Sequence, residues 1–204
     1  MKKLINIKLS PLKRKTFSLH MFYSALEGII LGVLAMNEFI FITSLKGTDY
    51  MVAFLFLFSM AVHLLLVFFN EFLKRTVNKK KMLRIVAIVT RLPLIALMFF
   101  PTEGNAYLEN PVYHYLFLGI FLIYFLGNPV IVPTVNLFLK NIYTHDNFGK
   151  LYSYASSVNR IITLISTFLC GLILDYNNYA FIYIYPFMAI AGLSSVFILS
   201  KIKY

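Results

Sequence analysis

Residues 50–73 read YMVAFLFLFSMAVHLLLVFFNEFL, and no charged side chain occurs among them before Glu71. A run of this length and apolarity predicts a helix that crosses ~30 Å of hydrocarbon. A helix is expected because lipid offers no hydrogen-bond partner to a free backbone N–H or C=O group. This stretch therefore predicts an integral membrane protein.

Comparable apolar runs recur along the whole chain. Apolar residues make up 60% of the sequence and charged residues 13%, against about 45–50% and about 25% in soluble domains. We predict an all-α fold, a polytopic six-transmembrane-helix bundle that forms one transmembrane domain over residues 1–204. The expected spans are 22–45, 50–73, 82–100, 112–139, 152–174 and 180–199.

Basic residues mark alternate connections between these spans. They gather in the N-terminal tail, in the loop at Lys79 and beside Lys140, whereas the loops at Glu103 and Asp175 are acidic. Because basic loops stay on the cytoplasmic side, both termini are predicted to be cytoplasmic, in a cell or inner membrane. Anionic lipid accounts for the net charge of +11, so the lipid bilayer is an expected partner and nucleic acid is not.

Motifs of enzymes and metal sites are missing from the sequence. It contains no G-x-S-x-G, H-E-x-x-H or P-loop pattern, and each of these carries a specific chemistry. Cys170 is the single cysteine, which excludes an intrachain disulfide and a Cys-based metal site. We therefore expect no enzyme activity, no cofactor and no metal.

Polar side chains inside the spans are the candidate functional residues, because they are costly in lipid unless they face protein or water. In the first span Glu27 and Glu38 share a helix face, beside a packing ridge that includes Gly28 and Gly32. The candidates for a substrate or proton pathway are Glu27, His63, Asn128, Asn159, Arg160 and Thr163.

Two prolines predict a break in the fourth span. Pro129 and Pro133 each lack an N–H group and clash with the preceding turn. The break is either a fixed kink or part of a gating or binding site. His63 likewise is either a hydrogen-bonded interior residue or part of a proton pathway.

The uneven distribution of polar residues predicts how the spans are arranged. The first, second, fourth and fifth spans should enclose a polar cavity into which His63, Asn128 and Thr163 point, with the third and sixth spans peripheral. Glu27 and Arg160 lie at similar depth and are expected to pair. Arg91 is a rival partner for Glu27, but it is expected to snorkel to the cytoplasmic surface.

The loop after the second span carries Phe72, Arg75 and Lys79. It is similar to the signature G-x-L-x-D-R-x-G-R-K, in which Arg75 and Lys79 match and Phe72 replaces the leucine. With the six-span topology, this loop resembles one half of a major facilitator superfamily transporter, the family to which that signature belongs. Other positions of the signature differ. They include Asn70 at the first glycine and Lys74 at the aspartate, with Glu71 as a possible acidic substitute. The stretches 144–157 and 171–175 are also similar to the family.

This resemblance implies two inverted three-helix repeats and a secondary carrier that moves a small, unknown solute by alternating access. The family normally has twelve helices. The chain is thus expected to be incomplete alone and to work with a second six-helix half or as a homodimer. Two alternatives stay open: a six-helix subunit that captures substrate for an energy-coupled importer, and a non-transporting remnant.

Overall fold

The computed structural model describes residues 10–202, which are all-α and contain no strand. Six of its helical stretches are long and apolar enough to cross a membrane, as predicted. These spans one to six are Pro11–Ser44, Asp49–Phe69, Lys79–Phe99, Val112–Ile142, His145–Tyr176 and Phe181–Leu199.

Four of the spans are built from more than one helical element, whereas spans five and six are each one helix, α9 (His145–Tyr176) and α10 (Phe181–Leu199). Span one contains α1 (Pro11–Leu34), α2 (Asn37–Phe39) and the π-helix η1 (Ile40–Ser44). Span two contains α3 (Asp49–Leu64) and the first part of α4 (Leu66–Arg75). Span three contains α5 (Lys79–Arg91) and the 3-10 helix η2 (Leu92–Phe99). Span four contains α7 (Val112–Phe125) and α8 (Asn128–Ile142). The short α6 (Gly104–Glu109) lies in the loop before α7.

Spans one and five begin earlier in the structure than their apolar runs suggest. They start at Pro11 and His145, not at residues 22 and 152. A helix continues past the apolar boundary because its backbone hydrogen bonds do not depend on side-chain polarity, and Pro11 suits a helix start, where its missing N–H is not needed.

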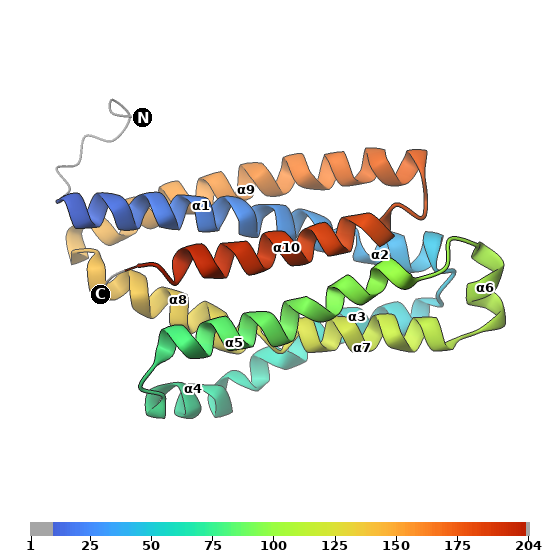
Figure 1. Cartoon of the computed structure of the whole chain (residues 1–204), viewed down its shortest axis with the longest axis horizontal. Coiled ribbons are helices and arrows are strands. Elements are labelled where there is room, and N and C mark those ends of the chain that lie inside the picture. The colour runs from blue at the N-terminus through green and yellow to red at the C-terminus, as the bar shows by residue number, and fades with distance from the viewer. Residues whose placement is uncertain (1–9, 203–204) are drawn as a thin grey trace.

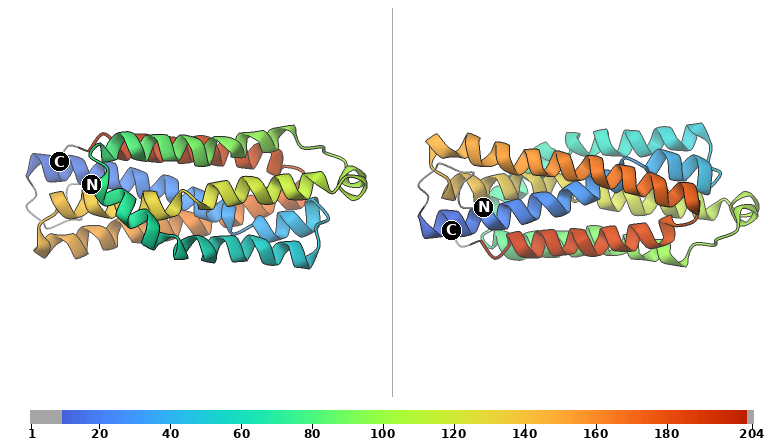
Figure 2. Two further views of the ribbon diagram at one scale, coloured as in Figure 1. Left: turned by 90° about the horizontal axis from the view of Figure 1, so that it is seen from below. Right: turned by 90° about the horizontal axis from the view of Figure 1, so that it is seen from above.

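The spans form three rows, which Figure 2 shows lengthwise, from below and from above. Spans one and four form the middle row. Spans three and six pack on one side of it, and spans two and five lie on the other side. Spans two and five are the least buried of the six, so this side of the bundle is open, and we call it the open face.

The packing order has an internal symmetry. α1 packs along α9 and α10, while α7 and α8 pack along span two and span three. α10 also packs against α5 and η2. If spans one, two and three are exchanged with four, five and six, every one of these neighbour relations maps onto another.

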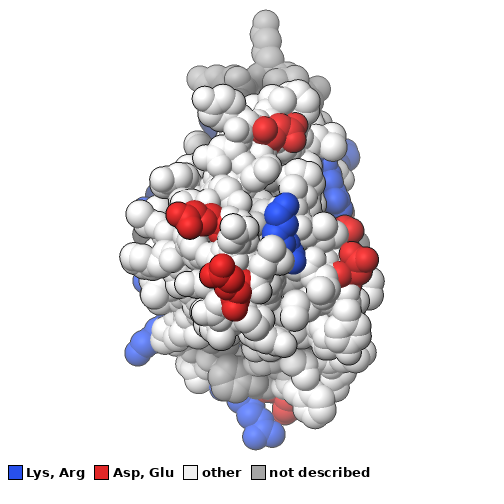
Figure 3. Space-filling model, turned by 90° about the vertical axis from the view of Figure 1, so that its right-hand side faces the viewer, with Lys and Arg blue, Asp and Glu red and all other residues white. Residues whose placement is uncertain are grey.

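Apolar side chains are buried in separate clusters at the two ends of the bundle. The cluster near the described chain ends includes Phe17 and Ile202, so the chain enters and leaves the bundle at one end, on the left of Figure 1. The opposite end, which we call the far end, holds an aromatic core of Phe41, Phe117 and Phe121. Figure 3 views the far end, where acidic side chains lie around a basic side chain near the centre of the face.

Candidate functional site

Span one is interrupted in the far half of the bundle. α1 ends at Leu34, and the chain turns through Ala35 and Met36 before α2 begins. The following residues form the π-helix, in which Leu45 N–H donates to the Ile40 carbonyl across five residues. Such π-segments are uncommon and often mark functional positions in helices.

Span four is interrupted at a corresponding place. α7 ends at Phe125, and α8 begins after the turn at Leu126 and Gly127. The break lies directly before Pro129, as one proline predicts, whereas α8 continues through Pro133, where no break occurs. A Cβ on Gly127 would lie 2.7 Å from the Thr90 hydroxyl, so the missing side chain lets the broken span approach span three closely.

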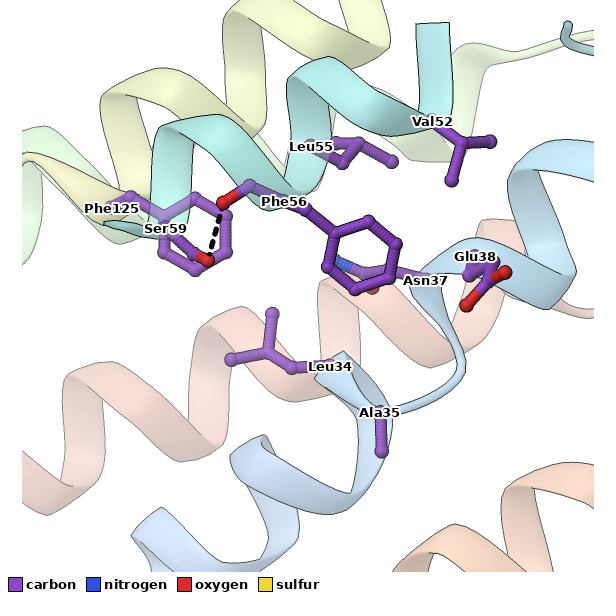
Figure 4. A pocket seen from close by; sticks show the side chains of 9 residues that line it. All are labelled: Leu34, Ala35, Asn37, Glu38, Val52, Leu55, Phe56, Ser59 and Phe125. Carbon is purple, nitrogen blue, oxygen red and sulfur yellow. Dashed lines mark hydrogen bonds between the residues drawn. The ribbon is translucent and has the colours of Figure 1, made fainter. Parts of the chain in front are cut away.

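A half-open cavity of about 280 Å³ lies where these two breaks meet span two. Figure 4 shows its walls, which come from α1, α2, α3 and α7. The lining side chains are Leu34, Ala35, Asn37, Glu38, Val52, Leu55, Phe56, Ser59 and Phe125. A mostly apolar pocket with a few polar groups is typical of a small-molecule site.

The polar groups of the cavity are Asn37, Glu38 and Ser59. Asn37 is 7% exposed, and its Oδ1 accepts a hydrogen bond of 2.9 Å from the Tyr185 hydroxyl. Ser59 Oγ donates to the Phe56 carbonyl at 2.8 Å, which leaves its own lone pairs available. Glu38 is exposed at the rim, and no described lysine or arginine forms an ion pair with it.

A second polar cluster lies deeper in the bundle, between spans one, three and six. Arg91 Nη2 donates to Glu27 Oε1 at 2.8 Å, and the Ser195 hydroxyl donates to the same oxygen at 2.6 Å. Arg91 is 3% exposed, and the Glu27 side chain 18% exposed. Arg91 Nη1 also donates to Ser195 Oγ at 2.9 Å and to the Gly192 carbonyl. The guanidinium thus makes three hydrogen bonds, and the Ser195 hydroxyl adds a fourth between spans six and one.

Gly192 makes this cluster possible. A Cβ at that position would lie 2.8 Å from Arg91 Cδ and 2.9 Å from Nη1. Only a glycine leaves room for the arginine to cross from span three to span six. The cluster is a closed, satisfied ion pair that ties three spans together.

The predicted pairing of Glu27 with Arg160 is wrong. Arg91 takes that place, and it is a core residue, not one that snorkels to the surface. Arg160 is exposed on α9, in a shallow groove with Tyr152 and Ser156. Glu27 and Arg160 lie at similar depth in the membrane, but similar depth does not decide which helices are neighbours in the bundle.

The predicted cavity walls also need correction. His63 is exposed and bonds within its own helix, to the Ser59 carbonyl at 2.7 Å. Asn128 and Thr163 are half-buried, but neither lines the cavity, and span five contributes nothing to it. The polar stripes of spans two and five therefore do not converge. Spans three and six contribute to the core, with span six among the most buried.

Two of the predicted site residues pack on span one instead. Asn159 Nδ2 donates to the Ser24 carbonyl at 2.9 Å, and Thr163 Oγ1 donates to the Asn159 carbonyl. A Cβ on Gly28 would lie 2.6 Å from the Asn159 carbonyl, and one on Gly32 would lie 2.8 Å from the Thr163 carbonyl. The predicted glycine ridge is confirmed as a packing surface, and its partner is α9.

The stretch after span two begins in the last turns of α4 and ends in a short connection to α5. Asn70 lies in α4, and Glu71 in the same helix contacts Lys74 at 3.6 Å and Arg75 at 3.4 Å. Lys79 Nζ donates to the Thr76 carbonyl at 3.0 Å. Glu71 is therefore the acidic group that faces the basic residues of this loop.

Comparisons with protein-family models, curated proteins and solved structures gave no match. The function is therefore inferred from the two polar sites, the cavity and the Arg91 cluster. The residues of these two sites differ in how they could be recognised from the sequence. Arg91 is a rival partner for Glu27 in the sequence, but choosing it over Arg160, and finding Ser195, requires knowing which spans neighbour span one. Asn37 lies beside a helix break that has no proline or glycine within it.

Proposed function

We propose that the chain is one half of a major-facilitator-type secondary carrier, which moves a small solute by alternating access. The observation that carries this proposal is the exchange symmetry of the packing order between spans one to three and spans four to six. Inverted repeats of this kind underlie many secondary transporters, whose binding sites lie at broken helices near the repeat interface. The breaks in spans one and four are equivalent under the exchange, and the cavity joins them.

The open face supports the second part of the proposal, that the chain works with a partner. Spans two and five flank spans one and four there, and they are the least buried spans. Alternating access rocks one helical bundle against another around a central site. A second six-helix chain or a second copy of this chain would supply that bundle on the open face.

Reconstitution tests the proposal directly. Purified protein would be screened for solutes that raise its unfolding temperature, and each hit would be measured by counterflow in proteoliposomes. We expect saturable counterflow only where two bundles are present, as counted by photobleaching of single labelled particles. Saturable uptake by a demonstrated monomer would contradict the half-carrier proposal.

The orientation needs its own test. We propose that both termini are cytoplasmic, because the far end holds Glu103 and Asp175 whereas Lys79 lies at the other end. In a Cys170→Ala background, an impermeant maleimide added outside cells should label a cysteine at Glu103 and spare one at Lys79. The reverse labelling would invert the topology.

One observation favours a second candidate, a substrate-capturing subunit of an energy-coupled importer. Spans one, two and four of one six-helix chain already form a pocket with a few polar groups. Such a subunit would bind its solute tightly as a monomer and show no counterflow alone. Uptake that appears only with an added ATPase module would favour this candidate over the half-carrier.

A further inference from the structure

We infer that the cavity at the two helix breaks binds a small organic cation, an amine with an apolar body, and that Glu38 is its counter-ion. This cation is the class of solute that the proposed carrier would move, and only that role in transport rests on the proposed function. Spans one, two and four of this chain already supply the lining of the cavity.

The first argument is the state of the Glu38 carboxylate. It lies at the rim of a mostly apolar cavity, and no described lysine or arginine pairs with it. The contrast is Glu27, the other carboxylate of the same span, which Arg91 neutralises at 2.8 Å. A carboxylate near hydrocarbon is costly unless a cation or water compensates it, and a bound ammonium group supplies that compensation.

The second argument is the buried Asn37 side chain. Its Oδ1 is taken by Tyr185, and no described residue accepts a hydrogen bond from Nδ2. Figure 4 places this side chain among the cavity-lining residues, next to Phe56. No buried side-chain nitrogen or oxygen of the described residues lacks a hydrogen-bond partner, so Nδ2 is open to the cavity and to water there. Oδ1 has a second lone pair, which can accept a hydrogen bond from an ammonium group of the ligand.

The third argument is the character of the walls. Leu34, Val52 and Leu55 offer an apolar surface, and the rings of Phe56 and Phe125 lie on the cavity. Aromatic faces attract cations and also stack with apolar rings. One carboxylate is too few charged oxygens for a Ca²⁺ or Mg²⁺ cage, so the site suits an organic cation.

The fourth argument is the charge of the far end. In the connections at this end the charged residues are acidic, except for Lys46. The acidic residues of this end are Glu38, Asp49, Glu103, Glu109 and Asp175. Clustered negative charge raises the local concentration of cationic solutes and repels anionic ones.

The test is isothermal titration calorimetry on the full chain in nanodiscs of neutral lipid. The probes are phenethylamine, 2-phenylethanol and 3-phenylpropionate, which share a ring and differ in the charge of the head group. We expect the amine to bind roughly tenfold or more tightly than the alcohol, as a charge-assisted hydrogen bond implies. The carboxylate should bind most weakly. Equal affinities for the amine and the alcohol, or no binding of the amine to folded protein, would overturn the inference.

Three variants locate the effect. Glu38→Gln should lower amine affinity to the level of the alcohol and leave alcohol binding unchanged. Asp49→Asn, an exposed acid of the same end outside the cavity, should lower amine affinity only slightly, through the weaker field of the far end, and leave alcohol binding unchanged. Ser59→Leu fills part of the cavity and should weaken both probes. If Glu38→Gln retains the preference, or Asp49→Asn abolishes it equally, Glu38 is not the counter-ion.

The outcomes separate this inference from the carrier proposal. If an amine binds through Glu38 but gives no counterflow in any assembly, the cation site is supported and the carrier proposal is contradicted. Saturable counterflow of an anionic solute, together with no amine binding, would keep the carrier and remove the cation site.

Discussion

Span one holds two carboxylates that the sequence places on one helix face, and the structure treats them in opposite ways. Glu27 is bound by Arg91 at 2.8 Å and by the Ser195 hydroxyl at 2.6 Å. Glu38 is exposed at a cavity rim and has no described cationic partner. The difference arises from what lies beside the helix at each height, since both residues are glutamates on the same span.

At Glu27 the neighbour is α10, with α5 behind it, and Gly192 leaves space for the arginine between them. At Glu38 the helix has already broken, and the neighbouring side chains come from α3, which offers apolar groups and Ser59. A closed ion pair fixes the bundle, whereas an uncompensated carboxylate beside a cavity is available to a ligand. The following predictions separate these two roles by stability.

The largest effect is expected from Arg91→Ala. It leaves the buried Glu27 carboxylate without its cation and should lower the free energy of unfolding by about 3–5 kcal/mol. Thermal unfolding can be followed with a thiol-reactive dye, because Cys170 is the single cysteine and is buried in the folded chain. The control is Arg160→Ala, an exposed arginine whose loss should change stability by less than about 0.5 kcal/mol.

The pair can also be tested by repair. Glu27→Gln introduced into Arg91→Met removes the orphaned charge and should recover at least half of the lost stability, since a neutral replacement of a buried pair is often tolerated. If Arg91→Ala unfolds no earlier than Arg160→Ala, the ion pair does not hold the three spans together.

A smaller loss is expected from Gly192→Ala. The added Cβ would meet Arg91 Cδ at 2.8 Å and force the guanidinium away from Glu27, at a cost of about 1–3 kcal/mol. Gly119 is the matched control because a Cβ there meets nothing within 4 Å. Gly119→Ala should be neutral or stabilising, since alanine favours the helix. Equal dye-labelling temperatures for the two variants would contradict the close contact.

The sequence was informative about each helix and poor about which helices are neighbours. Apolar runs predicted the six spans, Pro129 the break in span four, and Gly28 with Gly32 a close helix contact. Each of these is a local property of one helix. The partner of Glu27 is not local, because depth fixes height along the bundle and leaves the lateral neighbour open.

The break in span one shows the same limit. Leu34, Ala35 and Met36 are ordinary helix residues, and no proline or glycine marks the interruption. Tertiary contacts set this conformation: Asn37 is held by Tyr185, and the end of the span by the bond between His114 Nε2 and the Leu45 carbonyl at 2.7 Å. The cavity and the role of Glu38 therefore required the structure.

A modest effect is expected from Asn159→Ala. The variant loses the hydrogen bond to the Ser24 carbonyl, which joins α9 to α1. Hydrogen bonds between membrane helices contribute about 0.6 kcal/mol on average, so the unfolding temperature should fall slightly. Ser157→Ala is the control, as an exposed polar residue of the same helix. A loss as large as that of Arg91→Ala would give Asn159 a role beyond helix packing.

The smallest effect on stability is expected from Glu38→Gln, in direct contrast to the Arg91 variant. The carboxylate has no described ion-pair partner and is exposed, so its neutralisation removes no contact on which the bundle depends. The free energy of unfolding should change by less than about 0.5 kcal/mol. The dye-labelling temperature of Cys170 reports this change, and Asp49→Asn serves as the control. A destabilisation of several kcal/mol would mean that Glu38 holds the broken span in place, and the contrast between the two carboxylates would then fail. A small gain in stability would instead agree with a charge that is costly at the rim until a cation binds.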